Sequence, residues 1–115
     1  MKSYNGFTPQ QREHAANVQR EAIKQGLMPK PSDCKCTICG QDRGIRHYHN
    51  EDYSEDKIIS DAKVVCWRCH MMIHARFKHP LSFAKYMLDV VLYKKRFRPI
   101  FRGDAWGELE QHYID

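Results

Sequence analysis

The stretch Cys66-Trp-Arg-Cys69-His70-Met-Met-Ile-His74 brings two cysteines and two histidines together in nine consecutive residues. A second cysteine pair with the same spacing, Cys36-Thr-Ile-Cys39, lies 26 residues earlier. Two residues between cysteines allow both thiolates to face one ion, and two such pairs complete a tetrahedral shell of four sulfurs. The spacing therefore predicts one structural Zn²⁺ bound by Cys36, Cys39, Cys66 and Cys69, rather than two redox dithiols or four free cysteines.

The fifth cysteine, Cys34, has no partner at this spacing that the other four do not already fill. It either replaces Cys36 as a ligand, if the turn around the first pair is built differently, or it is a free thiol near the site without a chemical role. Gly40 directly follows the first pair and suits the positive φ that such a turn requires.

The sequence predicts an α+β fold. Thr8-Pro9-Gln10-Gln11 is typical of a helix start, because Thr8 can cap, Pro9 suits the first helical position and Gln11 can close a capping box. Gly26 is a natural end for this helix. We expect next a linker over 28–32, a turn-rich knuckle over 34–44, strands over 45–48 and 62–65, and helices over 67–78 and 80–97.

The last of these helices is apolar around most of its circumference, with only a narrow polar stripe. Such a helix is expected to be covered on more than one side. The N-terminal helix is one candidate for the second contact. A second copy of the chain is the other, which would make the helix 81–97 a homodimer interface; a different protein partner fits the same surface.

Charge is distributed unevenly along the chain. All 19 Lys and Arg lie at or before Arg102 together with ten of the 14 acids, so this body carries a formal charge of +9, whereas the segment 103–115 holds the other four acids. A basic body favours phosphate-rich partners, because neutralising phosphates releases counterions; solubility is the alternative explanation. The acidic tail is expected either to cover the basic surface as a lid or to pack on the body through Trp106 and Leu109.

Membrane insertion and secretion are not expected. No apolar run approaches the ~20 residues of a membrane-spanning helix, and Met1–Gly6 has no hydrophobic stretch typical of a secretory signal. Clustered cysteines in a reducing compartment bind metal more readily than they form disulfides. We therefore expect a cytoplasmic protein without a membrane partner.

Three histidines form a second candidate site. His70 and His74 are four residues apart on the predicted helix, so both project from one face, and His49 lies at the end of the first predicted strand. Together they suit a second divalent ion, Mg²⁺, Mn²⁺ or Zn²⁺, with open coordination positions. Taken singly, each histidine is better explained as a structural residue, and His47 as a surface residue.

The combination of Cys-x-x-Cys, a histidine-rich strand and the 66–74 stretch resembles the zinc-containing branch of the HNH endonuclease superfamily. His49-Asn50-Glu51-Asp52-Tyr53-Ser54 is similar to a segment of small phage and bacterial HNH-like proteins that usually reads His-His-Glu-Asp-Tyr-Ser. The resemblance implies a bacterial or phage-encoded protein with a ββα-metal or treble-clef zinc domain over 34–79. Residues 1–33 would form an N-terminal helix and linker, and 80–115 a C-terminal helix and acidic tail on the same domain.

The resemblance also implies catalytic roles for His49, Asn50, His70 and His74, but the chain departs from the family pattern. If the chain is aligned on Glu-Asp-Tyr-Ser, His49 falls on the metal-ligand position and Asn50 on the general base, which asparagine cannot be. If it is aligned by distance from Cys39, His49 becomes the base and Tyr48 falls on the ligand position. In that alignment His70 and His74 are the two histidines that hold the metal, and water or Asp52 completes its coordination shell.

Cations interleaved with aromatic rings follow His74, as in proteins that grip a phosphate backbone. Lys94-Lys95-Arg96 has a second explanation, since cations at a helix C-terminus oppose its dipole. We predict a metal-dependent HNH-type endonuclease with a structural zinc bound by the four paired cysteines. Its expected substrate is nucleic acid, with DNA favoured over RNA. The alternative is a non-catalytic HNH-like zinc module that binds nucleic acid or a host protein. The predicted nucleic-acid contacts are Arg76, Lys78, Lys94, Lys95, Arg96 and Arg98.

Overall fold

A computed structural model describes residues 1–103 and 105–115. It contains helices and one two-stranded antiparallel sheet, as the α+β prediction requires. In chain order the elements are α1 (Pro9–Lys24), the 3₁₀ turn η1 (Pro31–Asp33), β1 (Arg46–His49), the 3₁₀ turn η2 (Glu55–Lys57), β2 (Lys63–Cys66), α2 (Trp67–Ala75), α3 (Pro80–Met87), the π-helical turn η3 (Leu88–Leu92) and α4 (Trp106–Glu110).

Helix α1 begins as its sequence predicts. Gln11 N–H donates to the Thr8 hydroxyl (3.1 Å) and the Gln11 side chain accepts from Thr8 N–H (2.8 Å), which completes a capping box. Pro9 occupies the first turn, where its missing N–H costs nothing. Gly26 follows the helix with φ of +77°, a conformation that few other residues adopt readily.

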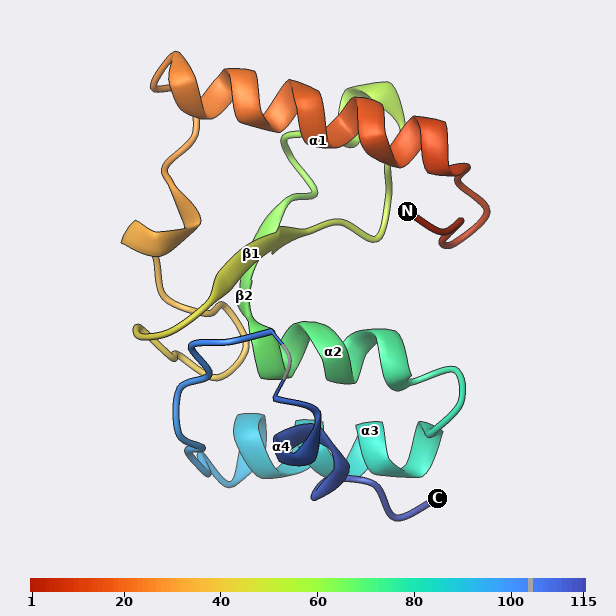
Figure 1. The fold of residues 1–115 in the computed structure, drawn as a ribbon, viewed down its shortest axis with the longest axis vertical. Coiled ribbons are helices and arrows are strands. Elements are labelled where there is room, and N and C mark those ends of the chain that lie inside the picture. Colours follow the sequence, from red (N-terminus) through yellow and green to blue (C-terminus); the bar gives the residue numbers. More distant parts are fainter. Residues whose placement is uncertain (104) are drawn as a thin grey trace.

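The sheet connects the two ends of the molecule. Strand β1 pairs with β2 in a register that places Arg46 opposite Cys66 and His49 opposite Lys63. Helix α1 lies beyond one end of this hairpin, whereas α2, α3 and α4 lie together beyond the other (Figure 1). The polar loop between the strands bonds to α1, because the Gln19 amide donates to Asn50 Oδ1 (2.8 Å) and to the Ile58 carbonyl (2.9 Å).

The main core lies between the knuckle, α2 and the C-terminal segments. Met72, Tyr86, Val90 and Leu109 are buried there with other apolar residues. Arg68 is also buried, and its guanidinium donates to the Glu108 carbonyl (3.0 Å) and the Arg98 carbonyl (3.1 Å), so it ties α2 to the returning chain. None of the helices formed by the described residues is both long and apolar enough to cross a membrane.

The prediction of a helix over 80–97 is wrong at its C-terminal end. Regular helix stops at Met87, one π-helical turn continues to Leu92, and Lys94 takes a positive φ of 56°, which breaks the run. The predicted helix over 67–78 also stops early, at Ala75. In both places the chain turns to bring the following segment onto the core, and this tertiary packing outweighs helix propensity.

The second contact expected of that helix comes from the C-terminal segment, because the Tyr86 ring meets that of His112 at 4.8 Å and Ser82 Oγ accepts from Ile114 N–H (2.7 Å). Helices α1 and α3 lie at opposite ends of the molecule (Figure 1), so α1 does not supply the second contact. Tyr86 and Val90 face the core, while Leu81 and Leu92 are each more than 60% exposed. One face of the predicted homodimer helix is therefore uncovered within a single chain.

The acidic tail packs on the body. Leu109 is buried, and the ring of Trp106 meets that of Trp67 edge to face at 5.5 Å, although Trp106 remains half exposed. Glu108 pairs with the buried Arg68 and with Arg98. Asp104, another of the tail acids, lies outside the described residues.

The close approach of the segment around Ile100 to the start of β1 depends on Gly44. Ile45 N–H donates to the Ile100 carbonyl (2.7 Å), and a Cβ on Gly44, whose φ is +74°, would lie 2.4 Å from that oxygen. Gly26 has a similar φ of +77° but open space around it.

We predict that Gly44→Ala destabilises the protein more than Gly26→Ala. The Gly26 change costs about 1–2 kcal/mol, because only backbone strain is added; the Gly44 change costs about 1–3 kcal/mol more from the steric clash. Urea unfolding of both variants measures the difference. Equal losses of unfolding free energy would contradict the close approach at Ile100.

Candidate metal centres

Four cysteine thiols converge between the knuckle and the start of α2. One sulfur from each of Cys36, Cys39, Cys66 and Cys69 lies within 4.8 Å of the others, and the Cys39 and Cys66 sulfurs are 3.7 Å apart. Cys36, Cys66 and Cys69 are buried, and Cys39 is partly buried. The four thiols are therefore arranged to bind a metal ion such as zinc.

The surroundings of these sulfurs suit thiolates. Backbone N–H groups of Cys39 and Cys69 donate to the sulfurs of Cys36 (3.5 Å) and Cys66 (3.4 Å). The Tyr86 hydroxyl is 3.0 Å from Cys69 Sγ, and burial together with the negative charge of Cys69 raises the pKa of Tyr86, so its proton remains available to the sulfur. Hydrogen bonds from the other three thiols lower the pKa of Cys36, whereas interaction with Cys36 raises that of Cys69. Four thiolates at this spacing repel one another, so a cation is needed to hold them all ionised.

Cys34 stands outside this group. Its thiol is half-buried and donates weakly to the Lys30 carbonyl at 3.5 Å. Of the two alternatives for the knuckle, the geometry therefore places Cys36 rather than Cys34 with the other three sulfurs. Gly40 has the positive φ (+80°) expected directly after the first pair.

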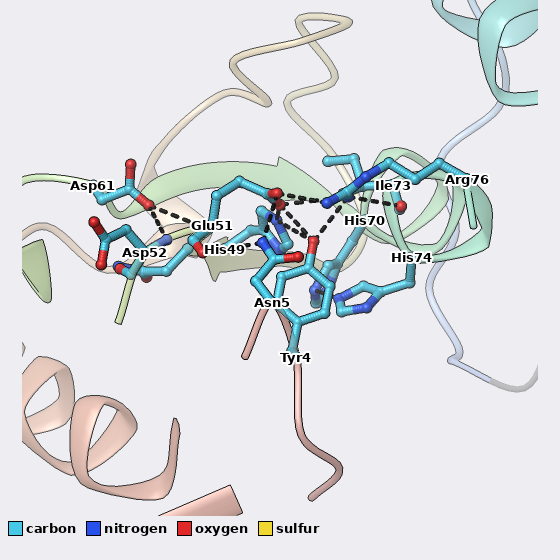
Figure 2. Close-up of polar contacts among 11 residues, drawn as sticks. Tyr4, Asn5, His49, Glu51, Asp52, Asp61, His70, Ile73, His74 and Arg76 are labelled. Carbon is cyan, nitrogen blue, oxygen red and sulfur yellow. Dashed lines mark hydrogen bonds and ion pairs between the residues drawn. The ribbon is translucent and has the colours of Figure 1, made fainter. Parts of the chain in front are cut away.

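The second group is formed by His49 at the end of β1 and by His70 and His74 on α2. Each offers a ring nitrogen, and the three nitrogens lie within 4.8 Å of one another. His70 Nε2 and His74 Nε2 are 3.1 Å apart, as expected for residues one helical turn apart. Figure 2 shows the two helix histidines beside His49, with Tyr4 against them.

Two ring nitrogens of this group are bonded to neighbours outside it, one on His49 and one on His70. His49 Nε2 bonds to the Glu51 carboxylate, while His49 Nδ1 is buried and has no hydrogen-bond partner in the described part of the chain. His70 Nδ1 lies 3.2 Å from His47 Nδ1. Metal-ligating histidines typically have their second nitrogen bonded in this way, so the residues present fit an ion.

The electrostatics keep His70 and His74 neutral, which is the form of imidazole that binds metal. Burial and then the positive charge of His74 lower the pKa of His70 to about 3. Burial and then the charge of His49 lower the pKa of His74 to about 4. Burial also lowers the pKa of His47.

A polar network that the sequence analysis missed surrounds His49. The Glu51 carboxylate accepts hydrogen bonds from Tyr4 Oη (2.5 Å), Asn5 Nδ2 (2.9 Å) and Arg76 Nη2 (2.6 Å), as Figure 2 shows. Burial opposes ionisation of Glu51, but the hydrogen bonds from Tyr4, His49 and Asn5 outweigh it and lower its pKa to about 2. No local spacing signals Tyr4, because it lies 45 residues from His49 in the sequence.

Asn50 and Tyr48 point away from the imidazoles. Asn50 is buried, and its amide donates to the Ile58 (3.1 Å), Lys57 (3.3 Å) and Asp52 (3.2 Å) carbonyls. Tyr48 Oη donates to the Pro29 carbonyl (2.5 Å). The structure groups His49 with His70 and His74. Asp52 accepts from Ser54 N–H and is not one of the grouped ligands.

The predicted nucleic-acid contacts fall into two groups. Arg76 and Lys78 follow the histidines at the end of α2, and Arg76 is paired with Glu51. The other group follows η3, where the chain runs near the start of α2 rather than its end (Figure 1). Within it Arg98 is paired with Glu108, and Arg96 and Arg98 line a small hollow next to Cys39 and Cys66. Lys94, Lys95 and Arg96 are exposed in this second group.

No protein-family model, curated protein or solved structure matches the chain. What the chain does must therefore be inferred from the chemistry of its own two clusters.

We predict that the chain binds one equivalent of zinc that depends on the four grouped cysteines and not on Cys34. Cys66→Ser should lose this zinc and unfold at lower urea, because a ligand and a helix-start contact are lost together. Cys34→Ser is the matched control and should retain both. Elemental analysis of purified protein measures the stoichiometry; zinc loss in Cys34→Ser would overturn the ligand assignment.

We also predict that protein without metal at the histidine cluster loses stability as the pH falls from about 6.5 toward 4. His70 and His74 would titrate near 6.5 in the unfolded chain but only at about 3 and about 4 when folded. The unfolded chain therefore binds more protons in this window, and stability is fully present only above it. Comparing wild type with His70→Gln by urea unfolding across this range separates the effect from thiolate protonation. If the unfolding free energies of the two proteins fall in parallel with pH, the prediction is wrong.

Proposed function

We propose that this protein is a metal-dependent HNH-type endonuclease that hydrolyses phosphodiester bonds in DNA. The observation that carries the proposal is the contrast between its two clusters. Structural zinc sites are closed by four protein ligands, whereas catalytic sites use three and keep a position open. The four cysteines match the first pattern, and His49, His70 and His74 match the second.

The order of elements supports the same family. A cysteine-bearing knuckle is followed by an antiparallel hairpin and then by a helix that starts at the second cysteine pair. This is the order of a ββα-metal or treble-clef domain. The histidine at the end of β1 faces two histidines of α2, which is the arrangement that the sequence resemblance implies.

The chain's own residues would prepare the site as follows. The Glu51 carboxylate fixes the orientation of His49 through Nε2, and His47 is placed to do the same for His70 through Nδ1. The positive charge of Arg76 is largely offset by Glu51. A divalent ion held by the three imidazoles would polarise the scissile phosphate and stabilise the charge of its transition state.

One observation favours a second candidate function. The position of the family's general base is Asn50, whose amide is committed to backbone carbonyls of the loop and has no titratable group. A chain that keeps the metal ligands but not the base is suited to hold nucleic acid, or a host protein, without cutting. This is the non-catalytic HNH-like zinc module.

We predict that the purified protein nicks supercoiled plasmid only when Mg²⁺, Mn²⁺ or Ni²⁺ is added, and that His74→Ala abolishes nicking while Cys34→Ser does not. Asn50→His would supply a general base only if its ring left the loop carbonyls that the Asn50 amide now bonds. Where it does so, we expect the nicking rate to rise by about 10²-fold or more, because general bases typically contribute about 10²–10⁴. Zinc content and circular dichroism check that each variant is folded.

Three outcomes separate the candidates. Metal-dependent nicking by wild type that is lost in His74→Ala supports the nuclease. Nicking by Asn50→His alone supports a disabled homologue that retains the metal site. Absence of nicking in both folded proteins contradicts the nuclease, and plasmid binding measured at fixed salt then tests the second candidate.

A further inference from the structure

Arg12 of α1 is held in an unusual setting. Its guanidinium carbon lies 5.2 Å from the ring centre of Tyr4 and 5.4 Å from that of Tyr53. Nη1 donates to the Lys2 carbonyl (2.6 Å), but Nε is buried and finds no hydrogen-bond partner in the part of the chain that the structure describes. Among the described residues no carboxylate lies within ion-pair distance of Arg12. Its charge is therefore fixed in place by aromatic faces and not neutralised.

This cation lies next to the histidine cluster. The Tyr4 ring that contacts Arg12 also packs against His74, with 4.7 Å between ring centres, and against His49 at 5.7 Å. Arg12 is thus separated from the cluster by a single aromatic ring. Arg76, which packs over the same Tyr4 ring at 5.5 Å, is bonded to Glu51. Of the two arginines on Tyr4, Arg12 is the one whose charge remains free for an external anion.

We propose that Arg12 is the residue that recognises the phosphate of the substrate at the histidine cluster, by donating from its guanidinium to a non-bridging phosphodiester oxygen. The inference rests on the proposed function, because it requires an ion at His49, His70 and His74. It adds a recognition residue from α1, which lies outside the segment that resembles the HNH family.

The Arg12 guanidinium is preorganised to bind an anion. A guanidinium presents planar N–H donors that match phosphate oxygens, and stacking on aromatic rings removes much of the entropy lost on binding. An anion that reaches Arg12 gains a hydrogen bond to a charged donor without first breaking an ion pair. A purely structural Arg12, which only holds the N-terminal turn through Lys2, would not change phosphate affinity once the metal is bound.

The test uses full-length protein with zinc at the cysteines and Co²⁺ added to the histidine cluster. Weak ligand-field bands that appear without thiolate-to-cobalt charge transfer, and disappear in His74→Ala, report Co²⁺ at that cluster. Inorganic phosphate and, separately, a short DNA oligonucleotide are then titrated into wild type, Arg12→Gln and Arg20→Gln. Arg20 is the matched control, since it belongs to the same helix and, within 1–103 and 105–115, its guanidinium bonds only to the neighbouring Asn17 side chain.

We expect Arg12→Gln to bind Co²⁺ as wild type does but to bind phosphate and the oligonucleotide about tenfold more weakly, as for loss of one charged hydrogen bond. Arg20→Gln should leave both affinities unchanged. Equal weakening in the two variants indicates general electrostatics and overturns the inference, as do unchanged affinities in Arg12→Gln. If no His74-dependent Co²⁺ spectrum forms in wild type, the proposed metal site and this inference both fail. A normal spectrum with unchanged phosphate affinity in Arg12→Gln removes only the role of Arg12.

Discussion

The convergence of four thiols is the constraint on which the rest of the structure depends. Cys66 ends β2 and caps α2, and Cys69 lies in the first turn of that helix, so both the start and the rotation of α2 are fixed by the cluster. Once the helix phase is set, His70 and His74 must share the face turned toward β1, because they are one turn apart. The cysteine cluster thus also positions two histidines of the second cluster.

Separate interactions hold the parts of the chain that flank this centre. On the C-terminal side, Arg68 lies between the two cysteines of its pair and is buried against the carbonyls of Arg98 and Glu108. On the N-terminal side, the Tyr4 turn is bonded to Glu51 and Arg76. If either group of hydrogen bonds broke while the cysteine cluster stayed intact, a buried charge or donor would be left unpaired, which is costly. Both flanking segments are therefore held against the hairpin and α2.

The two clusters differ in ways that fit different tasks. The cysteines form a closed set of four in the core, while the histidines are a set of three with one buried nitrogen unpartnered among the described residues. Asn50 is committed to its loop, because its amide satisfies three backbone carbonyls that a histidine ring would not satisfy equally. Under the proposed HNH function, the general base would be expected at this position, so these hydrogen bonds of the loop bear on whether the chain cuts or only binds.

The sequence by itself determined the features that depend on local spacing. The capping box at Thr8, both cysteine pairs, the two strands to within one residue and the shared face of His70 and His74 all follow from neighbours within a few positions. Only the tertiary structure decided that the helix after Pro80 ends at Leu92, that Tyr4 and Glu51 enclose His49, that Asn50 turns into its loop and that Arg12 stands beside the cluster. These outcomes depend on contacts between residues tens of positions apart, whose packing and hydrogen bonds outweigh the local preferences that a sequence pattern reveals.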